Sequence, residues 1–142
     1  MKKCAWMSLL FLGLLLGGCA TPPPGTFERF REPGWTATEI RQDVGYDRAW
    51  QAMVSLLVRK FDIEFLAKDE GYIRTAWLYN WTGIIRADYR VRASVMFSDD
   101  RRTVEIKPEA QHQIDGEWIS GADSRLLPTL REDVIRAFGS RR

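Results

Sequence analysis

Few residues in this chain are able to do chemistry. It contains two cysteines and one histidine, so thiol or imidazole chemistry depends on Cys4, Cys19 and His112. Asp99 and Asp100 are neighbouring carboxylates, but adjacent residues in a predicted turn point apart and do not form an acid–base pair. The sequence has no glycine-rich phosphate loop and no spacing of His, Asp or Glu that suits a metal. We therefore expect no enzyme activity, no cofactor, no metal and an ordinary structural role for His112.

Cys19 is the exception because of the residues that precede it. An apolar run over residues 5–16 follows two lysines and is shorter than the ~20 residues needed to cross a bilayer. This pattern predicts a secretory signal peptide, and its last residues, LGGC, resemble the lipobox of bacterial lipoproteins. The resemblance implies cleavage before Cys19, acylation of its sulfur and its amino group, and, with Ala20 next, transfer to the outer membrane. The alternative is a plain signal peptide with a chance cysteine.

The chain is expected to have three parts. Residues 1–18 are the predicted signal peptide, residues 19–34 the lipidated cysteine with a proline-rich linker, and residues 35–142 one folded domain. The prolines of the linker favour an extended spacer between the membrane and the domain. Two of the 21 basic residues lie in the signal peptide, so the mature chain has 19 basic and 19 acidic residues. This balance gives no reason to expect nucleic-acid binding.

Hydrophobic periodicity predicts the order of the elements. Strands are expected over residues 36–44, 62–68, 72–80, 86–97 and 103–107, with a helix over residues 47–60 that Asp47 caps, and a loop or short strand over residues 116–121. The strand over residues 86–97 alternates strictly, which predicts one dry face made of Ala87, Tyr89, Val91, Ala93, Val95 and Phe97. A final helix is expected to be capped by Asp123 or Ser124 and to stop at Gly139. The predicted fold class is α+β: an antiparallel sheet with two helices packed on one face, in the order β-α-β-β-β-β-α, similar to a helix-grip fold.

Three aromatic residues alternate around the predicted hairpin: Trp77, Tyr79 and Trp81. A three-residue loop would place Trp77 opposite Ala87, so that the strand aromatics lie on the dry face of the sheet. Trp81 would then be exposed in the loop. A two-residue loop would slip the register by one and put Trp77 beside Asp88 on the wet face. We expect the first arrangement, because the second would leave large rings among arginines.

Arginines gather on the wet face of the predicted sheet. In the expected register Arg74, Arg86, Arg90 and Arg92 lie close together, partly offset by nearby carboxylates. One interpretation is a solvated face with weak ion pairs, and the other is a docking surface for an acidic partner or for lipid headgroups. The candidate partner-binding residues are Arg74, Arg86, Arg90, Arg92, Trp81 and Trp118.

The stretch from residue 46 to residue 77 resembles the helix-grip domain of BamC (NlpB-type) lipoproteins, which belong to the outer-membrane β-barrel assembly machinery. The residues that carry the resemblance are Tyr46, Asp47, Trp50, Ile63, Phe65, Gly71, Ile73 and Trp77. The chain would be a single-domain relative, and the family offers no catalytic residues to carry over. The resemblance implies an antiparallel sheet gripped by helices.

The expected function is therefore that of a non-enzymatic lipoprotein on the periplasmic face of the outer membrane. Its expected partners are the membrane, through the lipid on Cys19, and another envelope protein, with barrel assembly as the process that the resemblance suggests. The alternative is a carrier or sensor of a small amphiphile, a lipid or a glycan, held in a cleft between sheet and helices. A cavity of several hundred Å³ there, on the order of ~300–1,000 Å³, would favour the carrier.

Overall fold

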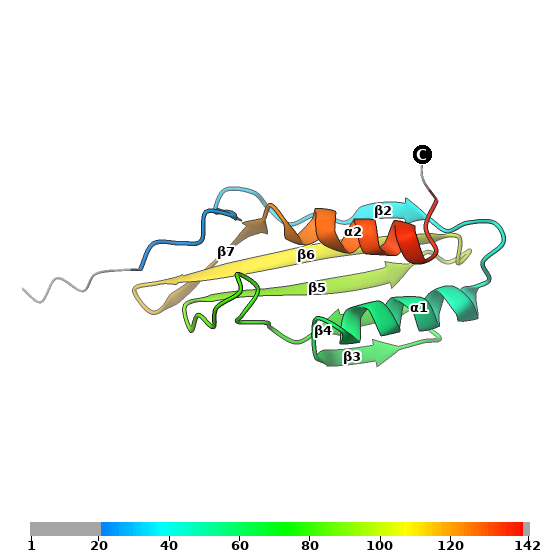
Figure 1. Cartoon of the computed structure of the whole chain (residues 1–142), viewed down its shortest axis with the longest axis horizontal. Helices are drawn as coiled ribbons and strands as arrows, with labels where there is room; N and C mark the ends of the chain where they lie inside the picture. Colours follow the sequence, from blue (N-terminus) through cyan, green and yellow to red (C-terminus); the bar gives the residue numbers. More distant parts are fainter. Residues whose placement is uncertain (1–20, 141–142) are drawn as a thin grey trace, which may run out of the picture.

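The computed structural model describes residues 21–140, which form an elongated α+β body (Figure 1). Within them the elements are β1 (Phe27–Glu28), β2 (Thr36–Glu39), α1 (Tyr46–Val58), β3 (Ile63–Ala67), β4 (Tyr72–Thr75), β5 (Tyr89–Phe97), β6 (Thr103–Ile114), β7 (Glu117–Asp123) and α2 (Leu126–Ala137). The predicted class is confirmed, and the predicted elements occur in the predicted sequence. The predicted order lacks β1, leaves β7 open as a loop or short strand, and ends the strand that became β6 at residue 107 rather than at Ile114. The signal peptide and Cys19 lie outside the described residues.

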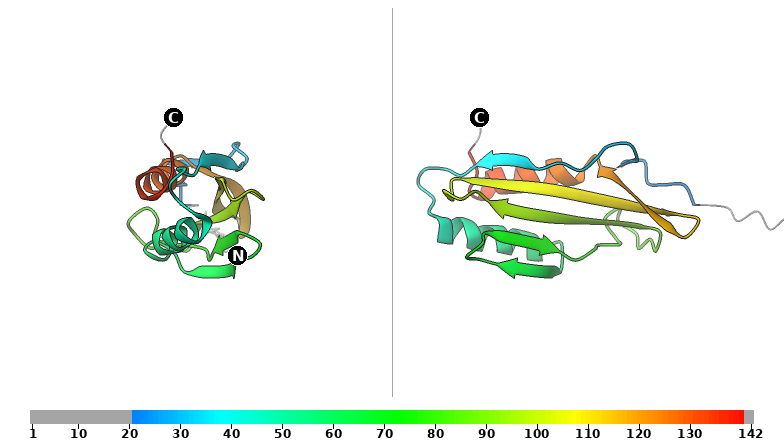
Figure 2. Two further views of the ribbon diagram at one scale, coloured as in Figure 1. Left: turned by 90° about the vertical axis from the view of Figure 1, so that its right-hand side faces the viewer. Right: turned by 180° about the vertical axis from the view of Figure 1, so that it is seen from behind.

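The strands form one antiparallel sheet, in the order β1-β7-β6-β5-β4-β3. The long strand β6 pairs with β5 along one edge, while its other edge pairs first with β2 and then with β7. The sheet curls around the two helices, which both lie on its inner side (Figure 2). No helix among residues 21–140 is both long enough and apolar enough to cross a bilayer.

Pro108 marks the point where β6 changes its partner. The Ala93 N–H donates to the Thr75 hydroxyl on β4, so the Ala93–Pro108 pair exchanges no backbone hydrogen bond between β5 and β6. The nitrogen of Pro108 must therefore face the other edge. Pairing with β2 ends there at Ile106, and pairing with β7 begins at Ala110. The missing N–H of Pro108 thus falls where no strand needs a donor.

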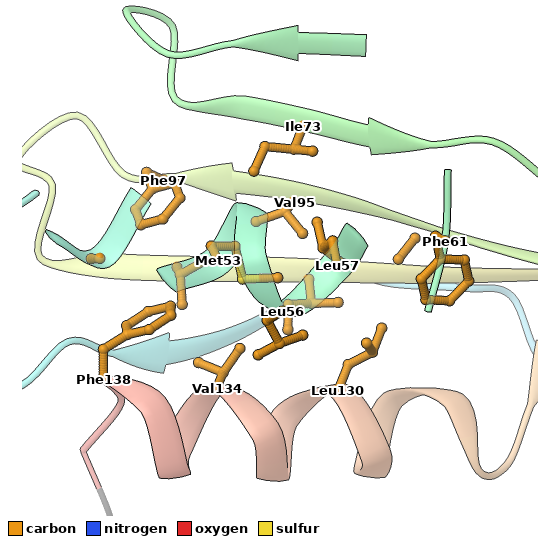
Figure 3. Close-up of a cluster of buried hydrophobic side chains, with 14 of the residues drawn as sticks. Met53, Leu56, Leu57, Phe61, Ile73, Val95, Phe97, Leu130, Val134 and Phe138 are labelled. Atoms are coloured by element: carbon orange, nitrogen blue, oxygen red, sulfur yellow. The ribbon is translucent and has the colours of Figure 1, made fainter. Parts of the chain in front are cut away.

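Side chains of the inner sheet face and the two helices make one core (Figure 3). The predicted alternation in β5 is confirmed, since Tyr89, Val91, Ala93, Val95 and Phe97 are all buried. Both helices turn one apolar stripe inward, with Met53, Leu56 and Leu57 from α1 and Leu126, Leu130 and Val134 from α2. Burial of these stripes, rather than helix propensity, holds the short helices in place.

Neither helix is capped as the sequence predicts. The predicted caps of α2 are Asp123 and Ser124, but its N-cap is Arg125, which has no side-chain cap hydrogen bond. Asp123 lies two residues before that N-cap, and its Oδ1 accepts hydrogen bonds from the backbone N–H groups of Arg125 and Leu126. The expectation that Asp47 caps α1 is wrong: the helix begins at Tyr46 after Gly45, and Asp47 lies in its first turn. There the Asp47 carboxylate lies 2.8 Å from the Lys68 ammonium.

The predicted register of the β4–β5 hairpin is wrong. β4 ends at Thr75, and Arg74 pairs with Ser94, so Thr75 lies beside Ala93. The predicted register, with Trp77 opposite Ala87, would place Thr75 beside Tyr89 instead. Further along, Leu78 pairs with Val91, one residue out of step with the β4 register. One extra residue therefore lies between Thr75 and Leu78 and reverses the side to which the following residues point. The connection to β5 is a long loop rather than a tight hairpin.

The N-terminal segment is part of the folded body, although the sequence predicted a linker up to residue 34. Phe27 pairs with Asp123 and Glu28 with Ala122, which adds β1 to the edge of β7. Gly121 allows this approach, because a Cβ at that position would lie 2.6 Å from the Glu28 carbonyl oxygen. The domain boundary predicted at residue 35 therefore falls too late.

Candidate functional site

A ladder of stacked rings and guanidinium groups covers the outer face of the sheet. The guanidinium carbon of Arg90 lies 4.5 Å from the ring centre of Trp77 and 3.9 Å from that of Trp118. The Arg92 guanidinium carbon also lies close to Trp77, 4.3 Å from its ring centre. The Tyr79 ring meets the Trp118 ring edge-on at 6.4 Å. We call Trp77, Tyr79, Arg90, Arg92 and Trp118 the tryptophan–arginine ladder.

Cross-strand hydrogen bonds hold the two arginines of the ladder flat. Arg90 lies opposite Gln111 and Arg92 opposite Glu109 in the β5–β6 register. Arg90 donates to Gln111 Oε1 at 3.0 and 2.8 Å and to the Tyr79 hydroxyl at 3.1 Å. Arg92 donates to both carboxylate oxygens of Glu109, at 2.9 and 3.3 Å. The rotamers are thus set before any partner arrives, which lowers the entropic cost of binding.

The charge of the ladder is balanced at Arg92 only. Glu109 neutralises Arg92, whereas the hydrogen bonds of Arg90 among the described residues go to a neutral amide and a neutral hydroxyl. The surface around Arg90 is aromatic and partly open, with Tyr79 37% exposed. The ladder therefore offers flat rings beside a cation, a composition common at the centres of protein interfaces.

The structure brings four of the six predicted binding residues to this outer face. Arg90, Arg92 and Trp118 belong to the ladder, and Arg74 lies on the same face because it pairs with Ser94 beside Arg92. Arg74 is occupied by an exposed ion pair with Glu64 at 2.8 Å.

Arg86 and Trp81 do not join them. Arg86 lies at the end of the body, where it makes two hydrogen bonds to the Asp88 carboxylate, at 3.0 and 2.8 Å. This pairing lowers the pKa of Asp88. The expectation of an exposed Trp81 is wrong, since its ring stacks on Phe61 with centres 6.3 Å apart and packs against the core.

Sequence reasoning missed Trp77 and Tyr79, which it assigned to the dry face. The extra residue in the strand turns both rings outward, toward Arg90. The sequence contained one indication of this change of side. Ile73 and Thr75, at odd positions, point inward, whereas Leu78, at an even position, also points inward. A break of that kind in the alternation indicates a bulge.

A buried polar cluster joins the N-terminal segment to the sheet and to α2. The Asp123 carboxylate accepts hydrogen bonds from the Tyr89 hydroxyl at 2.6 Å and the Thr26 hydroxyl at 2.7 Å. Burial, and then the hydrogen bond to Asp123, raise the pKa of Tyr89 far above its usual range. Close by, His112 Nε2 lies 3.4 Å from an Asp88 oxygen. His112 is only 2% exposed and Asp123 3%, and neither ring nitrogen of His112 has a hydrogen-bond partner among the described residues.

The space between sheet and helices is filled. Met53, Leu57, Val95, Leu130 and Val134 meet there with no exposed surface (Figure 3). A hollow of about 520 Å³ lies between the two helices and is lined by Ala52, Ser55, Leu56, Arg59, Lys60, Asp133, Arg136 and Ala137. Within residues 21–140 no three His, Asp or Glu side chains gather closely enough to hold a metal ion.

No protein-family model matches the chain, and no curated protein is significantly similar to it in sequence.

Proposed function

We propose that this protein is a non-enzymatic lipoprotein of the outer membrane, on its periplasmic face, that binds another envelope protein through the outer face of its sheet. The lipid on Cys19 is the proposed tether, on the strength of the lipobox-like sequence that ends at this residue. The resemblance of residues 46–77 to BamC makes β-barrel assembly the process to test first.

The tryptophan–arginine ladder is the observation that carries the proposal. Trp, Tyr and Arg are the residues that most often dominate binding energy at interfaces, and here they lie side by side on an open face. Arg90 has a planar fork whose charge no carboxylate hydrogen bond offsets among the described residues. A partner segment that brings a carboxylate to Arg90 and an apolar side chain to the rings would fit this face.

The ladder also ties neighbouring strands together, and a purely structural role is the competing explanation. Photocrosslinking in living cells separates the two roles. A photoreactive phenylalanine analogue at Tyr79 tests the ladder, and the same analogue at Glu132 on α2, a side chain with 73% exposure, is the matched control. We expect a discrete protein adduct from position 79, none from position 132, and loss of the adduct on adding Trp118→Ala. Equal labelling at both positions, or no adduct at 79, would refute the proposal.

The tether is tested separately by metabolic labelling. Labelled palmitate should enter the wild-type chain and should not enter the Cys19→Ser variant, which should also leave the membrane fraction. An unlabelled wild-type chain would refute the anchor while leaving the crosslinking result intact.

The alternative, a small amphiphile held between sheet and helices, has less support. The described side chains fill that space. The hollow between the two helices has Arg59, Lys60, Asp133 and Arg136 among its lining residues, and these charged groups do not suit an apolar tail.

A further inference from the structure

The loop between β4 and β5 ends in an apolar tip. Ile84 is 66% exposed and Ile85 82%. The base of this loop is firmly held: the Arg86 N–H donates to the Tyr79 carbonyl oxygen, and Gly83 N–H to the Asn80 carbonyl oxygen. Trp81 braces it from inside by stacking on Phe61. Two adjacent exposed isoleucines at the tip of a hydrogen-bonded loop form an apolar surface that is unfavourable in water.

This loop lies beside the N-terminal chain. Arg86 Nη2 donates to the Pro22 carbonyl oxygen at 2.8 Å, and the Phe27 N–H donates to the Pro24 carbonyl oxygen at 2.9 Å. The same end of the body carries the β4–β5 loop, the β6–β7 turn and the start of the described chain (Figure 1). Pro22, which the sequence assigned to an extended spacer, is therefore held to the folded body by Arg86, and the chain turns after it at Pro24.

The short chain between Cys19 and Pro22 limits how far this end of the body can lie from a membrane. Cys19 precedes Pro22 by three residues, and three extended residues span at most ~11 Å. If Cys19 carries the proposed lipid, the end of the body that holds Ile84 and Ile85 must lie at the headgroup level.

We propose that Ile84 and Ile85 insert into the lipid surface beside the anchor, as a second apolar attachment; this inference rests on the proposed lipidation of Cys19. The contact is apolar rather than electrostatic, because Arg86, the nearest cation in sequence, is paired with Asp88 at 2.8 Å. Two attachments fix orientation as well as distance. The long axis then points away from the membrane, and the tryptophan–arginine ladder faces sideways, open to a partner in the same leaflet.

Fluorescence of a probe at the loop tip tests the insertion. Acylated Cys19 has no free thiol and Cys4 leaves with the signal peptide, so Ile84→Cys supplies a single labelling site in the mature lipoprotein. The labelled protein is reconstituted in vesicles of phosphatidylethanolamine and phosphatidylglycerol that contain nitroxide-labelled lipid. The control is Asp99→Cys, in the β5–β6 turn at the opposite end (Figure 1).

We expect a blue-shifted, strongly quenched probe at position 84 and a solvent-exposed, unquenched probe at position 99. The signal at 84 should be lost on adding Ile85→Asp, an exposed change that spares the fold, and should not change with salt. If mass spectrometry shows that Cys19 is acylated and the two probes are equally exposed, the insertion is overturned while the anchor still stands. The insertion is also overturned if the loop tip is protected in native envelopes but exposed in pure lipid, because a protein rather than lipid then covers the tip.

A second arm does not depend on lipidation. The mature chain with Cys19→Ser and an N-terminal histidine tag is held on vesicles by a nickel-chelating lipid. Quenching at position 84 in this arm supports the insertion even if palmitate labelling of the native chain fails.

Discussion

The buried carboxylate of Asp123 gives the sharpest test of how the N-terminal segment is held. Asp123 is 3% exposed and accepts four hydrogen bonds. Two come from the hydroxyls of Tyr89 and Thr26, at 2.6 and 2.7 Å, and two from the backbone N–H groups of Arg125 and Leu126, at 2.9 and 3.1 Å. One side chain therefore joins β1, β5, β7 and the start of α2. We expect Asp123→Ala to destabilise the fold and to release β1 together.

The magnitude follows from the groups that lose their acceptor. Loss of the acceptor at the start of α2 costs about 0.5–2 kcal/mol. The Tyr89 hydroxyl, on a side chain that is 1% exposed, becomes an unsatisfied buried donor at about 1–3 kcal/mol. The Thr26 hydroxyl is only partly buried and can turn to water once β1 lifts. The free energy of unfolding should therefore fall by roughly 1.5–5 kcal/mol.

Urea unfolding of the unlipidated mature chain, followed by tryptophan fluorescence, measures this loss. The midpoint should drop while the slope stays constant. Asp123→Asn is the matched control, because its side-chain oxygen still accepts the two backbone N–H groups of α2 and its amide can donate to the two hydroxyls. It should lose less than Asp123→Ala. A loss below about 0.5 kcal/mol in Asp123→Ala, the scatter of ordinary surface changes, would refute the reasoning.

Three further predictions follow from the same contacts. Gly121→Ala should displace β1 and expose the chain near Phe27 to protease, because the added Cβ would lie 2.6 Å from a backbone oxygen. Gly25→Ala is the control: no atom lies within 4 Å of its added Cβ, so protease cleavage should not change. Equal cleavage of the two variants would contradict the proposed packing of β1 on Gly121. Trp77→Ala should lower the free energy of unfolding by about 1–2 kcal/mol in urea titrations, since two cation–π contacts are lost at about 0.5–1 kcal/mol each; an unchanged midpoint would mean that the ladder is not coupled to stability. Burial and Asp123 raise the pKa of Tyr89, so in the folded state its hydroxyl keeps its proton above the usual pKa of about 10. The stabilising effect of this hydroxyl is therefore full below that pH and declines above it. The melting temperature should fall more steeply above about pH 10 in the wild-type chain than in Tyr89→Phe, and parallel curves for the two chains would contradict this.

The parts of the fold that could be predicted are those carried by a local period. In β5 the alternation of Tyr89, Val91, Ala93, Val95 and Phe97 predicts the buried face, and the structure confirms it. The apolar stripe of α2 is equally local, because a helix shows its buried side within a few turns. Where the alternation breaks, at Leu78, the sequence carries a hint without saying how many residues the loop contains.

The candidate site depends on contacts that no local pattern encodes. Trp77 and Tyr79 turn outward because one extra residue precedes Leu78, and a shift of one residue exchanges the two faces of a strand. Trp81 is covered by Phe61, from a distant part of the chain. Similarly, β1 docks because Gly121, far along the sequence, leaves room for it. For each of these three features, several arrangements have similar local propensity. The arrangement that is formed is the one whose side chains pack best in the folded structure.

The sequence by itself therefore determined the class of the fold, the buried face of β5, the apolar stripe of α2 and the proposed lipid attachment at Cys19, since each is a property of neighbouring residues. Only the tertiary structure decided the register of β4 against β5, the ladder that follows from it, and the docking of the N-terminal segment beside the Ile84–Ile85 tip. The physical reason is that periodicity and short motifs are read within a few residues. Register and docking are decided by burial and close contact between segments that meet only when the chain is folded.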